Sequence, residues 1–293
     1  MQNKIINPSS STISINTART GKIGRLLIQQ GKISTEDVDK IVAAQEKFGL
    51  QFGDAAVKLG LISEMDVRQV LALQFNYPYL QNGQGQYSAE LVAAYQPFSQ
   101  QVEALRALRS QLMLRWFNES NKILAIVTAN SGEGGSYLAA NLAVMFSQLG
   151  ERTLLVDANM REPRQQAIFN IKENRGLSDI IAGRAGLDAV NQIEYFDELS
   201  IVTAGTIPPN PQELLNRASF TYFMNQAASQ YDVVLVDTPP AMLSADAQAT
   251  VARCGGALLV SRLNRTRISE ITEVRNQIAV TGARVVGAVI NDF

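Results

Sequence analysis

The sequence predicts an α/β fold: a parallel sheet with helices on both faces, preceded by a small, mainly helical tandem-repeat domain. Three observations lead to this prediction. Residues 22–74 contain a duplicated segment, residues 129–136 form a glycine-rich turn after an apolar run, and two later apolar runs each end in an aspartate, Asp157 and Asp237. Apolar strands that alternate with helical stretches are typical of parallel sheets covered by helices.

The repeat comprises residues 22–45 and 51–74, which align without a gap, so that each residue matches the one 29 positions later. Ser34 and Ser63 are expected to cap helices, and Gly31 and Gly60 to end the helices before them. Each copy is therefore predicted to be a helix, a glycine turn and a second helix. Two such units would bury their apolar faces on each other.

The spacing of this repeat resembles the MshEN-type amino-terminal domain of type II secretion and pilus ATPases, in which tandem motifs bind cyclic di-GMP. The resemblance implies a cyclic di-GMP site, and a docking or packing module is the alternative. The leading arginines of the motif are here Lys22 and Gln51, and Ala56 replaces a leucine. The implied ligand residues are Lys22, Gly24, Leu27, Gly31, Gln45, Gly53, Gly60 and Gln74.

Composition divides the chain into four parts. Residues 1–20 are expected to be a disordered N-terminus, 21–80 the MshEN-like tandem-repeat domain, 81–100 a linker rich in Gly and Gln, and 101–293 the second domain. Neither a signal peptide nor an apolar run of spanning length is evident. A cytoplasmic protein that reaches the inner membrane through a partner is therefore expected.

Charge and residue usage exclude several functions. The 26 basic and 27 acidic residues are spread along the chain, which argues against a nucleic-acid partner. The single cysteine, Cys254, and the absence of histidine exclude internal disulfides, Cys/His zinc sites and imidazole bases. Catalysis would have to rest on carboxylates, cations and backbone amides.

The glycine-rich turn connects a predicted strand, 122–128, to a predicted helix, 137–149. Such a turn exposes backbone N–H groups at a helix N-terminus, where phosphate oxygens bind. Ser136 occupies the position at which P-loop proteins place a hydroxyl that binds magnesium. The alternative is a plain glycine turn. The expected nucleotide-binding residues are Ser131, Gly132, Glu133, Gly134, Gly135, Ser136 and Tyr137.

Asp157 and Asp237 each end a buried strand, at the edge of the sheet where open parallel sheets collect their ligands. Together with Ser136 they are expected to hold Mg²⁺ beside the phosphates. A lone aspartate at a strand end is more often a cap, but two after a phosphate loop favour the metal site. Strands at 199–203, 256–261 and 284–290, with helical stretches such as 268–280, complete the predicted P-loop NTPase sheet.

Residues 101–293 resemble the bacterial tyrosine kinases, or BY-kinases, and most closely the EpsG-type exopolysaccharide chain-length determinant kinases. The matching motifs are GEGGS at 132–136, LLVDANMREP at 154–163, VVLVDTPP at 233–240 and NPQELL at 210–215. Glu103, Arg106 and Arg109 reproduce the E-x2-R-x2-R pattern that joins subunits in that family. The resemblance implies ATP or ADP with Mg²⁺, a homo-oligomer, and a membrane-embedded polysaccharide co-polymerase, the chain-length determinant, as partner.

Two residues depart from the family pattern. Gly135 stands where the family has a lysine, whose charge reaches the β and γ phosphates. Asn159 replaces the second aspartate of D-x-D, and an amide cannot accept a proton from an attacking hydroxyl. Arg161 and Arg164, just beyond Asp157, are candidates to replace the missing cation. The implied catalytic residues are Asp157, Asn159, Asp237 and Arg161.

Three functions remain open on this basis. The first is a tyrosine kinase that regulates exopolysaccharide chain length and export, acting on an internal tyrosine such as Tyr87, Tyr95, Tyr222 or Tyr231, or on another protein. The second is a nucleotide-binding pseudokinase or adaptor that acts by oligomer assembly. The third is a ParA/MinD-like positioning ATPase, which the NPQELL and E-x2-R-x2-R motifs disfavour.

Overall fold

The computed structural model describes residues 17–74, 79–80 and 84–293. It divides the chain into two compact units, Met1–Tyr77 and Pro78–Phe293. The predicted disorder of residues 1–16 lies outside the described residues, whereas residues 17–20 belong to the first helix. No helix within the described ranges has both the length and the apolar character that a bilayer-spanning segment requires.

Residues 17–74, the described part of the first unit, form four helices, and two of them begin with the same cap. The Ser34 hydroxyl accepts from the Asp37 N–H at 3.2 Å, and the Asp37 carboxylate accepts from the Ser34 N–H at 3.1 Å. Ser63 and Asp66 repeat this pair of bonds one period later. These reciprocal capping boxes confirm the predicted helix starts. The helices are α1 (Thr17–Gln29), α2 (Thr35–Phe48), α3 (Phe52–Lys58) and α4 (Glu64–Gln74).

Glycines make the turns and the closest helix contact of this unit. Gly31 and Gly60 have φ angles of 66° and 70°, the left-handed conformation expected after a helix end. Gly53 lies so close to α4 that a Cβ there would be 2.8 Å from a methyl of Val67. Leu27 is fully buried in the core between the helices. The duplicated pattern therefore builds a common apolar core.

The second unit is built on a seven-stranded sheet in the order β3-β4-β2-β5-β1-β6-β7. All pairings are parallel except that of β3 with β4. The parallel strands were predicted, but β3, which has two residues, was not. The strands are β1 (Ile123–Thr128), β2 (Thr153–Asp157), β3 (Asn191–Gln192), β4 (Leu199–Val202), β5 (Val233–Asp237), β6 (Gly256–Arg262) and β7 (Arg284–Asn291).

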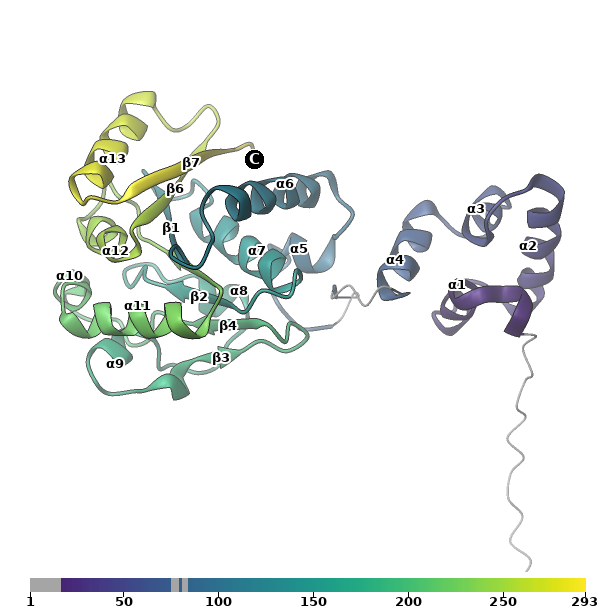
Figure 1. Cartoon of the computed structure of the whole chain (residues 1–293), viewed down its shortest axis with the longest axis horizontal. Coiled ribbons are helices and arrows are strands. Elements are labelled where there is room, and N and C mark those ends of the chain that lie inside the picture. Colours follow the sequence, from purple (N-terminus) through teal and green to yellow (C-terminus); the bar gives the residue numbers. More distant parts are fainter. Residues whose placement is uncertain (1–16, 75–78, 81–83) are drawn as a thin grey trace, which may run out of the picture. The chain divides into compact units, whose positions relative to one another are not determined.

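Helices cover both faces of the sheet, which confirms the predicted class (Figure 1). Successive residues of β1 enter opposite cores, Leu124 and Ile126 on the side of α6 and α7, Ala125 and Val127 on the side of α11 and α12. The helices are α5 (Val92–Tyr95), α6 (Gln100–Arg115), α7 (Gly135–Ser147), α8 (Gln165–Ile168), α9 (Leu177–Ile181), α10 (Pro211–Leu215), α11 (Ala218–Gln230), α12 (Asp246–Cys254) and α13 (Ile268–Val280), with the 3₁₀ helix η1 (Leu187–Ala189).

The described part of the predicted linker, residues 84–100, belongs to the second unit and is not a linker. The Asn141 side chain of α7 accepts from the Ala93 N–H and donates to the Glu90 carbonyl, both at 2.9 Å. The Gln148 amide donates to the Ala93 carbonyl at 3.1 Å. Leu91 is fully buried. The linker prediction was wrong because the Gly and Gln residues at 81–86 precede a short apolar segment, residues 91–94. Side-chain amides at and just after α7 bind the backbone of this segment.

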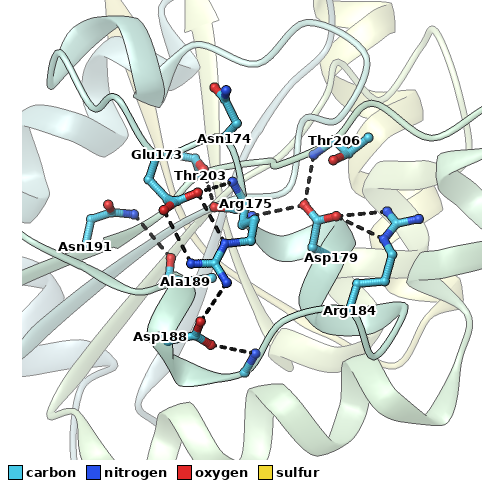
Figure 2. A network of polar contacts seen from close by, with 12 residues as sticks. Glu173, Asn174, Arg175, Asp179, Arg184, Asp188, Ala189, Asn191, Thr203 and Thr206 are labelled. Atoms are coloured by element: carbon cyan, nitrogen blue, oxygen red, sulfur yellow. Dashed lines mark hydrogen bonds and ion pairs between the residues drawn. The ribbon is translucent and has the colours of Figure 1, made fainter.

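A polar network orders the segment between α8 and β3. Figure 2 shows the Arg175 guanidinium between Glu173 and Asp188, at 3.3 Å and 2.8 Å. The Asp179 carboxylate accepts from the Thr206 N–H at 3.0 Å, which ties α9 to the turn that follows β4. These bonds hold the segment between α8 and β3 in place beside the sheet.

Candidate functional site

The turn between β1 and α7 wraps as a phosphate loop does. Gly132 and Gly134 have φ angles of 77° and 89°, which L side chains rarely adopt. A Cβ at Gly134 would also lie 2.5 Å from the Asn291 side-chain nitrogen and 3.1 Å from the Phe293 ring. Helix α7 begins directly after this turn, so its free N–H groups and positive dipole end face the same place.

Glu133 of this loop turns back into the protein. Its side chain is buried and accepts from the N–H groups of Ala129 and Asn130, at 2.9 Å and 3.0 Å. The Thr266 hydroxyl donates to the other carboxylate oxygen of Glu133 at 2.7 Å. The backbone carbonyl of Glu133 accepts from the Asn291 side-chain amide at 2.8 Å. Glu133 was predicted as a nucleotide contact. Its carboxylate instead accepts hydrogen bonds from the backbone at the start of the loop and so stabilises the turn.

We expect Glu133→Gln to lower nucleotide affinity about tenfold. Its amide oxygen can keep both backbone N–H bonds only if its nitrogen faces the side-chain amide of Asn130, which is also a donor. Calorimetric titration of the full chain with ADP measures the change. Glu119→Gln, at an exposed position in the turn before β1, is the control and should bind as the native chain does. Unchanged affinity in Glu133→Gln would show that the loop keeps its shape without this carboxylate.

The loop forms one wall of a cleft of about 420 Å³. The other walls come from the segment before α6, the turn after β2, the turn after β5 and the last residue of the chain. The cleft is lined by Glu90, Gln101, Thr128, Asn130, Ser131, Gly132, Glu133, Gly134, Gly135, Ser136, Tyr137, Asn159, Glu162, Arg164, Thr238, Pro240 and Phe293. All seven predicted nucleotide-binding residues are thus together in one hollow.

Asp157 and Asp237 are paired neighbours on β2 and β5, both with side chains removed from solvent. The Asp157 carboxylate accepts from three backbone N–H groups, those of Asn159, Arg164 and Gln165, at 3.0 to 3.1 Å. Burial, and then the charge of Asp237, raise the pKa of Asp157 to about 8. Burial also raises the pKa of Asp237 to about 6. Two adjacent carboxylates that are both buried lose hydration and repel each other when ionised. A bound cation would offset this unfavourable free energy.

The residues present fit a magnesium ion bound with nucleotide. One carboxylate oxygen of Asp237, Oδ1, is buried and has no hydrogen-bond partner in the described part of the chain, and the other accepts from the Gln165 amide at 2.8 Å. Gln165 also donates to the Ser136 carbonyl, which keeps Ser136 beside Asp237. Among the described residues there is no cluster of three or more acidic or thiol side chains. Magnesium suits such a sparse site because it keeps waters and phosphate oxygens as ligands.

Asn159 lies in the cleft but is already bonded to its own turn. Its amide donates to the Glu162 carbonyl at 2.9 Å, and its oxygen accepts from the Glu162 N–H at 3.1 Å. The side chain therefore shapes the turn after β2 at the position where the family has a carboxylate.

The two candidate cations take different positions. The Arg161 guanidinium is bound to the buried Asp246, with Nε 2.7 Å from its Oδ2, and does not line the cleft. The assignment of Arg161 to the phosphate site is therefore corrected, because a buried carboxylate holds it elsewhere. Arg164 does line the cleft, and its Nη2 lies 2.8 Å and 2.9 Å from the two oxygens of Glu90.

Gly135 is closely packed as well as uncharged. A Cβ at this position would be 2.9 Å from the Thr128 methyl group, and Thr128 is buried at the end of β1. A larger residue therefore requires Thr128 to shift. The Thr128 methyl group thus occupies space that the side chain of a lysine at position 135 would need.

The E-x2-R-x2-R residues lie on α6, and both arginines make contacts within the chain. Arg106 is paired with Glu103 and donates to the Pro97 carbonyl at 2.6 Å. Arg109 donates to the Met145 carbonyl of α7 at 3.0 Å. A role in joining subunits stays a prediction.

The implied cyclic di-GMP residues include several with structural contacts. Lys22 donates to the Gln74 carbonyl at 3.4 Å, and Gln45 to the Leu50 carbonyl at 3.3 Å. A shallow groove in this unit is lined by other residues: Leu50, Asp54, Val57, Lys58, Glu64, Val67 and Arg68. Cyclic di-GMP binding stays a prediction.

Three residues at the site were not predicted from the sequence: Glu90, Phe293 and Gln165. Glu90 and Phe293 come from opposite ends of the second unit, and only folding brings them to the loop. Gln165 is a neutral amide that links Ser136 to Asp237. Tyr137, which was among the predicted nucleotide-binding residues, has a buried hydroxyl without a partner among the described residues, and burial raises its pKa to about 12.

The fold and the loop define a protein of the P-loop NTPase fold, and comparison with known proteins is consistent with this class. A family model, "Cellulose biosynthesis protein BcsQ", matches residues 121–270. Tyrosine-protein kinase YwqD of Bacillus subtilis is 31% identical over 69% of this chain and 85% of its own length. The tyrosine-protein kinase etk of Escherichia coli is 32% identical over 68% of this chain.

Solved structures agree. The kinase domain of the Escherichia coli tyrosine kinase ETK has a TM-score of 0.68 and 29% identity, covering 72% of this chain and 83% of that domain. The septum site-determining protein MinD of Pyrococcus horikoshii, solved with Mg-ADP, has a TM-score of 0.52 and 22% identity over 58% of this chain and 70% of its own, a likeness of fold.

The chain belongs to the bacterial tyrosine kinase family, the BY-kinases. It spans only about a quarter of some of these relatives, 28% of etk.

Proposed function

We propose that the second unit binds ATP and ADP with Mg²⁺ and acts as a tyrosine-kinase-family regulator of exopolysaccharide chain length and export. One observation carries the nucleotide proposal. The left-handed glycines curl the loop at the start of α7, and an unpartnered oxygen of Asp237 lies next to Ser136 behind it. An anion with a hard cation satisfies both the free N–H groups and the buried carboxylates.

Slow phosphoryl transfer follows from the same site. Gly135 contributes no charge to the phosphates, and Asn159 cannot accept a proton. Loss of one preorganised stabiliser commonly slows an enzyme by roughly a hundredfold or more. These departures favour a second candidate, a pseudokinase or adaptor that binds nucleotide and acts by oligomer assembly. A ParA/MinD-like positioning ATPase rests on likeness of fold and is the weakest of the three.

The partners follow from the family resemblance. We infer a homo-oligomer in which Glu103, Arg106 and Arg109 take part, and docking on a membrane-embedded polysaccharide co-polymerase that places the chain at the inner membrane. The first unit is proposed to bind cyclic di-GMP or to serve as a docking module. Its capping carboxylates, Asp37 and Asp66, are partly buried and have lowered pKa values of about 2, chiefly through hydrogen bonds from Ser34 and Lys32 respectively.

Calorimetry of the full chain with ATP and with ADP, in the presence and absence of Mg²⁺, tests the nucleotide proposal. We expect binding that Mg²⁺ strengthens and that Gly134→Val abolishes, because valine cannot adopt φ of 89° and would meet Asn291. An anti-phosphotyrosine blot of the same samples separates kinase from pseudokinase. Tyr222 is 64% exposed, and Tyr222→Phe tests it as the acceptor. Absence of nucleotide binding in the native chain would refute both candidates.

A further inference from the structure

Arg164 differs in charge from the other residues that line the cleft. Among the described residues that line it, Arg164 is the one cation, whereas Glu90 and Glu162 present carboxylates. A bound triphosphate would therefore meet two acidic side chains and, with Gly135 in the loop, no lysine. The cleft needs a positive charge near the terminal phosphates, and one residue in it carries that charge.

The backbone fixes where Arg164 can reach. Its N–H donates to the Asp157 carboxylate at 3.0 Å, so the side chain starts from the turn beside the buried carboxylate pair. That pair lies on β2 and β5, on one side of β1 in the sheet order. A metal ion there would be shared with the outer phosphates of a nucleotide. Arg164 therefore starts from the turn beside this carboxylate pair and lines the same cleft as the phosphate loop.

The present partner of Arg164 is replaceable. The Glu90 carboxylate accepts from one guanidinium nitrogen only, Nη2, and both side chains are about half exposed, 51% and 43%. Exposed ion pairs of this kind contribute little, because water solvates both partners and salt screens them. A phosphate chain with several charges offers a stronger bidentate partner for an arginine.

We propose that Arg164 is the cation that binds the terminal phosphates in this chain, in place of the lysine absent at Gly135, and that Glu90 holds it in the nucleotide-free state. Nucleotide and Glu90 then compete for one guanidinium. This rests on the proposed nucleotide site and adds to it the residue that distinguishes ATP from ADP and a carboxylate that opposes binding.

Substitutions of Arg164 and of Glu90 have opposite expected effects on Mg-ATP binding. Arg164→Ala should weaken Mg-ATP binding roughly tenfold to a hundredfold, since it removes a charge-assisted contact, and Mg-ADP binding less. Arg164→Lys should recover part of the loss. Glu90→Gln should tighten Mg-ATP binding severalfold, because the amide is a weaker competitor for the guanidinium. Calorimetry on the full chain gives all three values.

Arg152→Ala is the matched control, because Arg152 is similarly exposed and bonded to a carboxylate, Asp232, outside the cleft. It should bind nucleotide as the native chain does. Thermal melting verifies that each variant is folded, and the half-exposed side chain of Arg164 is not part of a core.

Three results would overturn the inference. One is Mg-ATP affinity unchanged in Arg164→Ala, and another is weaker binding in Glu90→Gln. A third is a loss in Arg265→Ala with none in Arg164→Ala, which would assign the cation to the β6–α13 loop, where the Arg265 guanidinium lies 3.6 Å from a Cβ position on Gly132. A native chain that binds no nucleotide would instead refute the proposed function, and the inference with it.

Discussion

ATP hydrolysis by the double variant Gly135→Lys, Thr128→Ser is expected to exceed that of the native chain by roughly a hundredfold. The lysine supplies the charge that P-loop enzymes place on the β and γ phosphates. Thr128→Ser is needed because a Cβ at Gly135 would be 2.9 Å from the Thr128 methyl group, and serine keeps the hydroxyl while it removes that methyl. Release of phosphate from ATP and the anti-phosphotyrosine signal measure the gain.

Two single variants control this experiment. Thr128→Ser alone should behave as the native chain, and Gly135→Lys alone should melt at a lower temperature, because the new side chain meets a buried methyl group. Native activity already equal to that of the double variant would show that a cation such as Arg164, proposed above to bind the terminal phosphates, also replaces the lysine in phosphoryl transfer. A folded double variant with no gain would leave Asn159 as the defect that limits transfer.

Asp237→Asn is expected to stabilise the free protein and to weaken Mg²⁺-dependent nucleotide binding roughly tenfold to a hundredfold. The amide removes one of two adjacent buried charges, and its oxygen can still accept from Gln165. Its nitrogen would take the place of Oδ1, which has no partner now, next to Asp157. We expect a melting temperature about 3 °C higher at pH 8. Differential scanning calorimetry measures the melting temperature, and nucleotide titrations with and without Mg²⁺ measure the affinity.

The stabilisation should depend on pH with a defined sign. Burial and the charge of Asp237 raise the pKa of Asp157 from 3.8 to about 8 in the folded chain. A carboxyl with a raised pKa binds more protons when folded, so stability is retained at low pH and lost as pH rises through that window. The native chain should therefore lose stability between about pH 4 and pH 8, and Asp237→Asn should lose less.

Asp232→Asn, which alters an ion pair at the surface, is the control and should change neither the pH dependence between about pH 4 and pH 8 nor nucleotide affinity. Equal melting temperatures of Asp237→Asn and the native chain at pH 8 would show that the carboxylate pair is not strained. Mg²⁺-dependent binding unaffected by Asp237→Asn would move the metal away from this residue.

Local chemistry explains what the sequence determined by itself. The capping serines Ser34 and Ser63, the glycine turns and the strands ending in Asp157 and Asp237 were all predicted, because each depends on a few adjacent residues and on periodic apolar positions. The phosphate loop is of this kind, and so is the order of strands and helices that places two aspartates at the same edge of the sheet.

Only the tertiary structure decided which charges meet. Arg161 and Arg164 are equivalent candidates in the sequence, yet Asp246, 85 positions from Arg161, holds the first outside the cleft, and Glu90 holds the second within it. Residues 84–100 look like a linker until Asn141 of α7 and Gln148, the residue after this helix, bind their backbone. Such contacts join residues far apart in the chain, and no local pattern encodes them, because they depend on the distance between side chains after the sheet has formed.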